Sequence, residues 1–317
     1  MTYQVYLMIA LVLVLLSACS QSANNSSAGV LPPVDMVSVP AGDFVMGSEK
    51  EDTEGVQQRY GFPNPLYRDE RPRRKVSVAA FQIDSYEVSN KLYKLFILNS
   101  KRMMPFHWVN NGYALSEEKL KSMDVEKLRK IAVEYFKLDM DTRKMDKPQL
   151  LNAMLEQQKV LDTYPVGGVN WFEAKAFCEW RGARLPREAE WEKAARGTDG
   201  REYPWGNQWD PKITNTGDDA NWENGIAPVG AYPENRSPYG AYDMSGNVWE
   251  WVEDWYEPYP GSDHQSPLFG KINRVIRGGG GGVGHYAISY FFRAATRQYS
   301  EPELESEDVG FRCAKDA

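Results

Sequence analysis

The side chains with the most distinctive chemistry in this 317-residue chain are its three cysteines, Cys19, Cys178 and Cys313. A thiolate can act as a nucleophile, join a disulfide, carry a lipid or bind a soft metal such as Cu(I). Cys19 follows an apolar N-terminal run, whereas the other two stand far apart in the aromatic-rich remainder of the chain. The role of Cys19 therefore decides what the other two are free to do.

Residues 6–16 form an uncharged apolar run, which is about the length of a signal-peptide core and too short to cross a bilayer. Residues 16–19, Leu-Ser-Ala-Cys, resemble the lipobox of bacterial lipoproteins. This pattern predicts a signal peptide over 1–18 and acyl chains, such as palmitate, on Cys19. Residues 1–4 depart from the pattern because they hold no Lys or Arg. The alternative is a cleaved signal peptide with an incidental cysteine.

The stretch 20–33 is uncharged and consists mainly of Ser, Asn, Gln, Ala, Gly and Pro, which predicts a flexible lipidated tether over 19–34. No later stretch approaches about 18 apolar residues, so the predicted anchor is lipid alone. Aspartate after the lipidated cysteine usually retains Gram-negative lipoproteins at the inner membrane, so Ser20 favours the outer membrane. We expect an exported protein that is held at a bacterial bilayer through Cys19.

The charge and the cysteine count limit the partners and the compartment. The net charge is −7 with both signs mixed along the chain, so nothing favours binding to nucleic acid. If Cys19 carries lipid, two cysteines remain in an oxidising compartment, and one disulfide between them is the economical interpretation. That bond would close a loop of about 135 residues and restrict the unfolded chain.

Hydrophobic periodicity predicts mixed α and β structure. A strand over 37–48 is expected to enter a hairpin at a glycine turn. Further predictions are a strand over 75–84, helices over 87–98, 170–181 and 189–196, and loops over 49–72 and 200–245.

Residues 113–162 differ in composition, because Glu, Lys, Leu and Met dominate and Trp is absent. Two apolar stripes predict a helix, an extended turn and a second helix. The segment faintly resembles small helical modules that bind nucleic acid, of the Rho N-terminal or SAP type. The alternative, which the mixed charges favour, is a helical insertion that covers part of a larger domain.

Ten short motifs recur in a fixed order along the rest of the chain. They are VPAG at 39–42, MGS at 46–48, DERP at 69–72, EVSN at 87–90, VNW at 169–171, RLPREAEWE at 184–192, YPWGN at 203–207, YDMSGNVWEW at 242–251, RGG at 277–279 and GFRCA at 310–314. This ordered set resembles the formylglycine-generating enzyme family, also called sulfatase-modifying factor. The resemblance covers the domain predicted over 35–317, except the insertion at about 113–162.

The resemblance implies a single α+β domain with a C-type-lectin-related fold, little regular secondary structure and calcium among its loops. It also implies a disulfide between Cys178 and Cys313. A second family disulfide would join the positions of Ala195 and Ala294, where both halves are alanine.

This sequence departs most from the family pattern at the positions of the family's oxidase site. Its enzymes oxidise a substrate cysteine to formylglycine with copper that is held by two cysteines five residues apart. Alignment from Arg293 and Arg297 puts those positions at about Gly284 and Ser289, and no slip of register supplies a cysteine. Because soft thiolates select Cu(I), we expect no copper and no formylglycine-generating activity.

Calcium remains as an expected cofactor, since loops rich in Asn, Asp and backbone carbonyls supply the hard oxygens that it needs. One family calcium site corresponds to Asp243, Gly246, Val248 and Glu250. A second corresponds to Asn215, Thr216, Asn221 and Glu223. The alternative for the first set is a capped turn before a buried strand.

Three further features of the sequence predict a functional site less specifically. The histidines, His107, His264 and His285, lie in separate segments and do not predict a metal site. Glycines 278–282 could cradle a phosphate, but a turn in the family's substrate groove is the simpler interpretation. In the family the next segment lines the ligand cleft, which here would use His285, Tyr286, Tyr290 and Arg293. The alternative is that Tyr290 and Phe292 belong to a core strand.

Two functions remain. The first is a non-catalytic binding or scaffold lipoprotein with an unknown protein, peptide or glycan ligand, similar to gliding-motility and secretion lipoproteins that carry this domain. The second is an oxidase-type enzyme without catalytic cysteines, similar to the pyoverdine-maturation relative. A receptor diversified by a retroelement is a third and weaker possibility.

Overall fold

The structure, a computed structural model, describes residues 34–62, 66–217, 225–280 and 289–317. Residues Asp35–Ala317 form one compact unit. The predicted signal peptide and Cys19 lie outside the described residues, as does the tether except for Val34. Within the described ranges, no helix has both the length and the apolar character needed to cross a bilayer.

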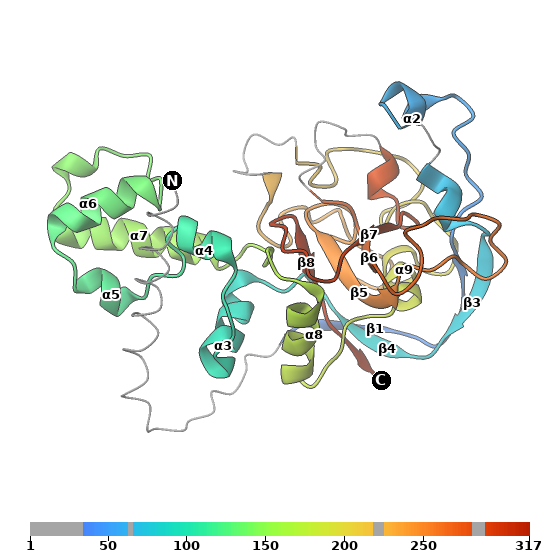
Figure 1. Ribbon diagram of the computed structural model, residues 1–317, viewed down its shortest axis with the longest axis horizontal. Helices are drawn as coiled ribbons and strands as arrows, with labels where there is room; N and C mark the ends of the chain where they lie inside the picture. The colour runs from blue at the N-terminus through green and yellow to red at the C-terminus, as the bar shows by residue number, and fades with distance from the viewer. Residues whose placement is uncertain (1–33, 63–65, 218–224, 281–288) are drawn as a thin grey trace. The chain divides into compact units, whose positions relative to one another are not determined.

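The strands form three small sheets (Figure 1). β1 (Met36–Val39), β4 (Phe81–Asp84) and β9 (Ala314–Asp316) make an antiparallel sheet in the order β1-β4-β9. β2 (Gly42–Met46) pairs with β3 (Arg74–Val78). The largest sheet has the order β7-β6-β5-β8, with bounds Gln298–Ser300, Arg274–Arg277, Trp249–Trp255 and Val309–Phe311. Because β5 and β8 are parallel neighbours, the WEW and GFRCA motifs lie side by side.

The predicted hairpin over 37–48 is wrong. β1 pairs with β4 and β2 pairs with β3, so the two strands enter different sheets. Pro40, which has no N–H to donate, and Gly42, with φ 130°, separate them and redirect the chain. The strand predicted over 75–84 is likewise divided into β3 and β4.

The three helices predicted at motif positions are confirmed, with small shifts at their ends. α3 (Asn90–Ser100) begins at Ser89, whose Oγ accepts the Leu92 N–H. α8 (Trp171–Trp180) begins at Asn170, whose Oδ1 accepts the Glu173 N–H at 3.0 Å. α9 (Glu188–Arg196) is followed by Gly197 in a positive-φ conformation. Short polar N-caps and a glycine stop are thus the local signals that fixed these ends.

The insertion holds more helices than predicted. It contains α5 (Glu117–Lys121), α6 (Val125–Glu134), the 3₁₀ turn η3 (Thr142–Lys144) and α7 (Lys147–Leu161), which lie together in Figure 1. The first predicted helix is divided because Asp124 caps a new N-terminus by accepting the Lys127 N–H at 2.8 Å. These helices enclose a hydrophobic cluster of their own, which includes Leu128, Phe136 and Met154.

Short helical turns occur within the loops. They are α2 (Val56–Arg59), η2 (Leu66–Glu70), α4 (Phe106–Asn110) and η6 (Ser289–Phe292). Two larger hydrophobic clusters form the rest of the core, one around Trp251 and Phe177 and the other around Trp191 and Val252. Ala195 and Ala294, the positions to which the resemblance assigns a second disulfide, are both fully buried in the second cluster.

The core is also rich in charge. Arg196, Arg277, Arg293, Arg297 and Arg312 are almost completely buried. Each donates hydrogen bonds to at least one buried or partly buried carboxylate. Burial of charge is costly unless it is paired, so this fold depends on an ionic framework as well as on aromatic packing.

Candidate functional site

The region of the family's copper cysteines contains no thiol in this chain. Gly284 lies outside the described residues, and Ser289 begins η6, where its carbonyl accepts a hydrogen bond from the Tyr203 hydroxyl at 3.4 Å. Cys178 and Cys313 are joined by a disulfide whose S–S distance is 1.99 Å. Cys19 is therefore the one cysteine of the sequence outside that bond.

The predicted cleft residues divide into two groups. His285 and Tyr286 lie outside the described residues. Tyr290 is only 2% exposed and its hydroxyl donates to the Leu66 carbonyl at 2.9 Å, so it belongs to the core and does not line an open cleft. It is in a 3₁₀ turn, not in the core strand that was the alternative.

Arg293, also predicted to line the cleft, is 1% exposed and acts as an ionic anchor. Its Nη1 donates to both oxygens of Glu70 at 3.0 and 2.9 Å, and its Nε donates to Glu202 at 2.6 Å. Burial raises the pKa of Glu70 to about 7, although Arg293 opposes that shift. Arg293 thus links η2 and η6 to Glu202, the residue directly before the 203–207 motif, beneath the surface.

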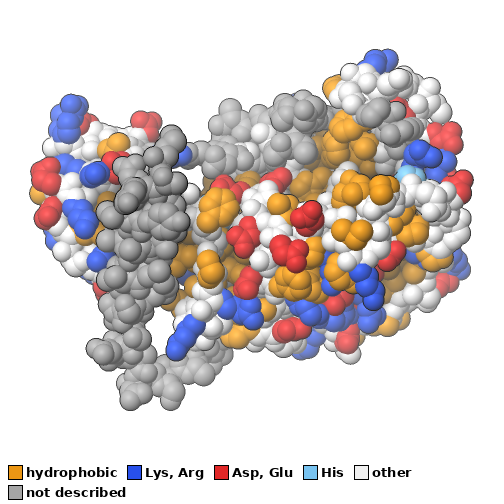
Figure 2. Space-filling model, in the orientation of Figure 1, with side chains coloured by type: hydrophobic (Ala, Val, Ile, Leu, Met, Phe, Trp, Pro, Cys, Tyr) orange, Lys and Arg blue, Asp and Glu red, His pale blue; other side chains and the backbone are white. Residues whose placement is uncertain are grey.

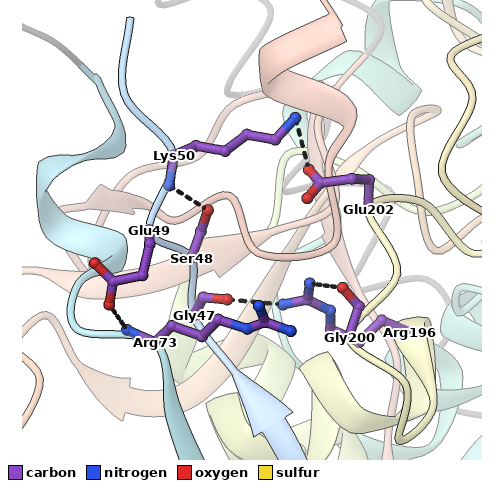
Figure 3. A pocket seen from close by; sticks show the side chains of 8 residues that line it. All are labelled: Gly47, Ser48, Glu49, Lys50, Arg73, Arg196, Gly200 and Glu202. Carbon is purple, nitrogen blue, oxygen red and sulfur yellow. Dashed lines mark hydrogen bonds and ion pairs between the residues drawn. The ribbon is translucent and has the colours of Figure 1, made fainter.

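A polar pocket of about 200 Å³ is lined in part by Ser48 and Glu202, two residues to which Arg293 donates hydrogen bonds. Figure 3 shows the residues that line this pocket. Its lining mixes cations and carboxylates, and the residues are Gly47, Ser48, Glu49, Lys50, Arg73, Arg196, Gly200 and Glu202. Lys50 Nζ lies 3.3 Å from Glu202, and Lys50 also lines a second pocket of about 330 Å³ beside Tyr67 and Arg68. These pockets offer hydrogen bonds and charge of both signs to a small polar group.

An aromatic cluster adjoins η6. The ring of Tyr203 stacks on Trp205 at 5.1 Å, and Trp209 stacks on Phe292 at 5.3 Å. Trp205 and Trp209 are half-buried, so part of each indole faces solvent. The YPWGN motif could have predicted this cluster, but its spacing alone did not show that the rings meet near η6.

The first predicted calcium set is only partly suited to an ion. Glu250 is fully buried, and Arg312 donates to both of its oxygens at 2.7 Å. The Trp191 indole N–H adds a third bond to Glu250 Oε2 at 2.9 Å. A carboxylate already neutralised by a guanidinium is a poor ligand for a second cation. Among the described residues, no group of three or more His, Cys, Asp or Glu side chains is placed to hold a metal ion.

Gly246 and Val248 shape the loop between Asp243 and Glu250. Gly246 has φ 84°, and a Cβ there would lie 2.4 Å from the Asn215 carbonyl oxygen, so only glycine fits. Its N–H donates to the Gly278 carbonyl at 2.6 Å, which ties the loop to the glycine run. Val248 is fully buried before β5.

Asp243 retains more capacity for a cation. Its Oδ2 accepts the Gly230 N–H at 2.6 Å, and its carboxyl lies within hydrogen-bonding reach of Glu87. Burial, together with the nearby Glu250, raises the pKa of Asp243 to about 6 against opposition from Gly230 and Arg312. Glu87 was missed at the sequence level, because the EVSN motif gave no sign that it would meet the 242–251 motif.

In the second predicted calcium set, Asn221 and Glu223 lie outside the described residues. Asn215 holds the loop together, since its Nδ2 donates to the Gly225 carbonyl and to Asn247 Oδ1, and its Oδ1 accepts the Gly217 N–H. Thr216 is buried beside it. The described half of this set therefore has a structural role that does not require an ion.

The two described histidines lie apart from these features. Burial lowers the pKa of His107 to about 4, so the ring is neutral at physiological pH. His264 packs edge-on against Phe269 at 5.4 Å. On the face drawn in Figure 2, basic and acidic side chains are interspersed, and no continuous basic stripe is visible.

The chain is similar to proteins of known family along nearly its whole length. Residues 21–317 match the model of the sulfatase-modifying factor enzyme 1-like domain. Formylglycine-generating enzyme from Bos taurus is 31% identical over 306 residues, which cover 90% of this chain and 75% of that protein. The Bos taurus protein named inactive C-alpha-formylglycine-generating enzyme 2 is 32% identical, with 90% and 89% covered.

A solved structure, that of PvdO from Pseudomonas aeruginosa, has a TM-score of 0.58 and 24% identity. The similarity covers 89% of this chain and 94% of PvdO, and it supports the predicted fold. The expected α+β formylglycine-generating-enzyme-like architecture is therefore confirmed. The chain belongs to the family of sulfatase-modifying factor enzyme 1-like domains.

Proposed function

We propose that the chain is an exported, lipid-tethered binding or scaffold module of this family, with calcium as a structural ion, and that it is not a formylglycine-generating oxidase. The observation that carries the proposal is that no cysteine of the chain is available to bind copper. Two of the three cysteines form the Cys178–Cys313 disulfide, and Gly284 and Ser289 stand where the resemblance expects the copper ligands. Cys19 remains, and its sequence context favours a lipid.

Loss of the oxidase site leaves a surface suited to binding. Half-buried Trp205 and Trp209 offer flat apolar faces of the kind that pack against sugar rings or peptide side chains. The mixed-charge pocket around Lys50 and Glu202 supplies polar groups for orientation. A peptide or glycan is therefore the proposed ligand class, and nucleic acid is not expected.

The proposed lack of formylglycine-generating activity can be tested with purified full-length protein in detergent. We expect no conversion of a cysteine-containing sulfatase-type peptide to formylglycine, even with added copper. Metal analysis should find calcium alone. A stoichiometric redox metal would overturn the proposal in favour of an oxidase-type enzyme that resembles the pyoverdine-maturation relative.

The anchor can be tested separately in cells of a Gram-negative host. Metabolic labelling with an alkynyl palmitate analogue should mark the wild-type chain and place it in the outer-membrane fraction. Cys19→Ala should lose the label and the membrane association. Retained label in Cys19→Ala would contradict the lipid tether, and a shift to the inner membrane would contradict only the assignment from Ser20.

The ligand class can be tested by screening peptide and glycan arrays with the same protein. Trp205→Ala should reduce the binding of any hit at least tenfold, because its exposed indole face is lost. Phe172→Ala removes an aromatic side chain that is 47% exposed on α8, and it serves as the matched control. Equal binding by both variants would exclude the aromatic cluster as the contact surface.

A further inference from the structure

Ser48, in the wall of the polar pocket of about 200 Å³, has a hydroxyl group with both acceptor positions occupied. Its Oγ accepts the Arg293 Nη2 hydrogen at 3.0 Å and the Lys50 backbone N–H at 3.0 Å. A serine hydroxyl has two acceptor positions and one O–H donor, so only the proton remains. Ser48 is 5% exposed, and its O–H has no acceptor among the described residues. The proton is therefore available to a ligand in the pocket.

The guanidinium of Arg73 is a second donor in this pocket without a protein partner. Figure 3 shows the side chain extended toward Gly200 and Arg196. It lies so close to the backbone that a Cβ on Gly200 would be 2.9 Å from Arg73 Nη2. The backbone N–H of Arg73 donates to Glu49 at 2.7 Å, but no side-chain hydrogen bond or ion pair joins its guanidinium to a described residue. Arg73 thus presents a positive charge and a planar set of N–H donors.

The other two cations of the pocket have carboxylate partners. Arg196 Nη1 lies 2.9 Å from Glu192, and Lys50 Nζ lies 3.3 Å from Glu202. Within the described ranges, Arg73 is the one cation of the lining with no carboxylate at ion-pair distance. One unmatched positive charge suits the single negative charge of a carboxylate better than the roughly −1.5 to −2 charge of a phosphate group.

The same pocket also offers hydrogen-bond acceptors. Glu202 Oε2 accepts from Arg293 at 2.6 Å, whereas Glu202 Oε1 accepts no hydrogen bond from a described residue. The Glu49 side chain is 59% exposed, and its Oε2 lies 4.0 Å from Arg71. These carboxylate oxygens can accept from hydroxyl groups of a ligand. The pocket therefore suits a molecule that carries both a carboxylate and hydroxyl donors.

The size and surroundings of the pocket suit one ring of such a molecule. Its volume of about 200 Å³ is below the roughly 300–1,000 Å³ of pockets that enclose drug-sized ligands. The Glu202 N–H donates to Asn207 Oδ1 at 3.0 Å, which ties the pocket wall to the turn that carries Trp205. Trp205 is half-buried, so its indole offers an apolar face to a neighbouring ring.

We infer that this pocket binds a uronic acid unit of a glycan, with Arg73 and the Ser48 hydroxyl as donors to the carboxylate and Glu202 as an acceptor for sugar hydroxyls. A uronate ring carries both kinds of group. An acidic side chain of a peptide carries its carboxylate on an apolar stem and would leave the acceptors unused. The inference rests on the proposed binding role and narrows its ligand class to acidic glycans.

The test uses the full-length protein in detergent and calorimetric titration with a glucuronate-terminated oligosaccharide and its glucose-terminated counterpart. Wild type should bind the glucuronate form more tightly by about tenfold or more, since a hydrogen bond to a charged group contributes about 1.5–3 kcal/mol. Arg73→Gln should bind both forms equally. Arg73 is exposed and its side chain has no partner in the described ranges, so this variant should fold.

The matched control is Arg59→Gln, which removes the same charge from an exposed residue of α2 that lines neither of the two pockets. It should keep the wild-type preference for glucuronate. Equal wild-type affinity for the two oligosaccharides, no binding of either, or an unchanged preference in Arg73→Gln would each overturn the inference.

An acidic peptide of the same charge is the third probe. Binding of this peptide that depends on Arg73, without binding of the glucuronate form, would overturn the assignment to a sugar. Trp205-dependent binding of an array ligand with no preference for a carboxylate would overturn only this inference and leave the binding role in place. Formylglycine formation would contradict the proposed function whatever the pocket binds.

Discussion

Two glutamates in the core, Glu192 and Glu87, have nearly the same burial and opposite electrostatic surroundings. Glu192 accepts from Arg196 at 2.9 Å, from Arg277 at 2.6 Å and from the Gly47 N–H at 2.7 Å. Burial alone would raise the pKa of Glu192, but Arg277 and Arg196 outweigh it and lower that pKa. Burial and the adjacent Asp243 raise the pKa of Glu87 well above its ordinary value.

The difference shows that burial alone does not tell whether a charged group supports the fold. Glu192 is balanced by two guanidiniums, so its charge is part of the ionic framework that joins α9 to β6. Glu87 has a carboxyl neighbour in place of a cation, so its charge is an internal cost unless a ligand balances it. Glutamine substitutions at both sites would compare these cases with the same change of one atom.

The largest effect is expected for Glu192→Gln. It leaves Arg277 and Arg196 with less negative charge in a fully buried site, which typically costs about 3–5 kcal/mol of unfolding free energy. Glu87→Gln in calcium-free buffer removes an unbalanced charge and should cost less than about 1 kcal/mol. Urea unfolding of the disulfide-intact proteins at pH 7 measures both.

The control for this comparison is retention of native structure. Near-ultraviolet circular dichroism of the many buried Trp residues should be unchanged in both variants below their unfolding transitions. Equal losses of unfolding free energy for Glu192→Gln and Glu87→Gln would show that the charges around the two glutamates do not make them differ in their contribution to stability.

Much of the fold could be predicted from the sequence, because local signals are strong where the motifs occur. Asn170 capped α8, and Gly197 ended α9, as their residue types require. The hairpin at Gly42 failed because strand alternation does not show which partner a strand selects. The division of the insertion at Asp124 was visible in the sequence as an N-cap, but the continuous apolar stripe concealed it.

The site was predicted less well, because its residues meet through long-range contacts. Arg293 was placed in a cleft, yet its partner Glu70 is more than two hundred positions away in sequence and buries it. Glu250 was assigned to calcium from its motif, and only the register of β5 beside β8 brings Arg312 to it. Glu87 could not have been chosen, since its role depends on Asp243 and Asn247 in a distant loop.

A second effect, of intermediate size, concerns pH in calcium-free buffer. The pKa of Asp243 is raised from its ordinary 3.8 to about 6, so the folded state binds that proton more tightly than the unfolded state. The resulting stabilisation is complete below pH 3.8 and is lost as the pH rises through 6. Burial and Asp243 also raise the pKa of Glu87 well above its ordinary value, and Glu87→Gln removes that titration, so wild type should lose more unfolding free energy between pH 5 and 8 than Glu87→Gln.

The comparison with Glu87→Gln isolates the pair from other groups. Burial also raises the pKa of Asp254 to about 6 and that of Glu70 to about 7, and both remain in the variant. Their shared contribution cancels in the difference between the two pH curves. Parallel curves for wild type and Glu87→Gln would mean that the pair does not titrate in this range.

The smallest effect is expected for Glu253→Gln, which breaks an ion pair of similar distance at the surface. Glu253 accepts from Lys175 Nζ at 3.0 and 3.3 Å, and its side chain is 37% exposed. Water solvates both partners when the pair is broken, so the loss should stay below about 1 kcal/mol and shrink further in high salt. Glu253→Gln could instead lose as much unfolding free energy as Glu192→Gln. In that case the N–O distance of an ion pair would determine its contribution more than its burial does, and the comparison of Glu192 with Glu87 would no longer be supported.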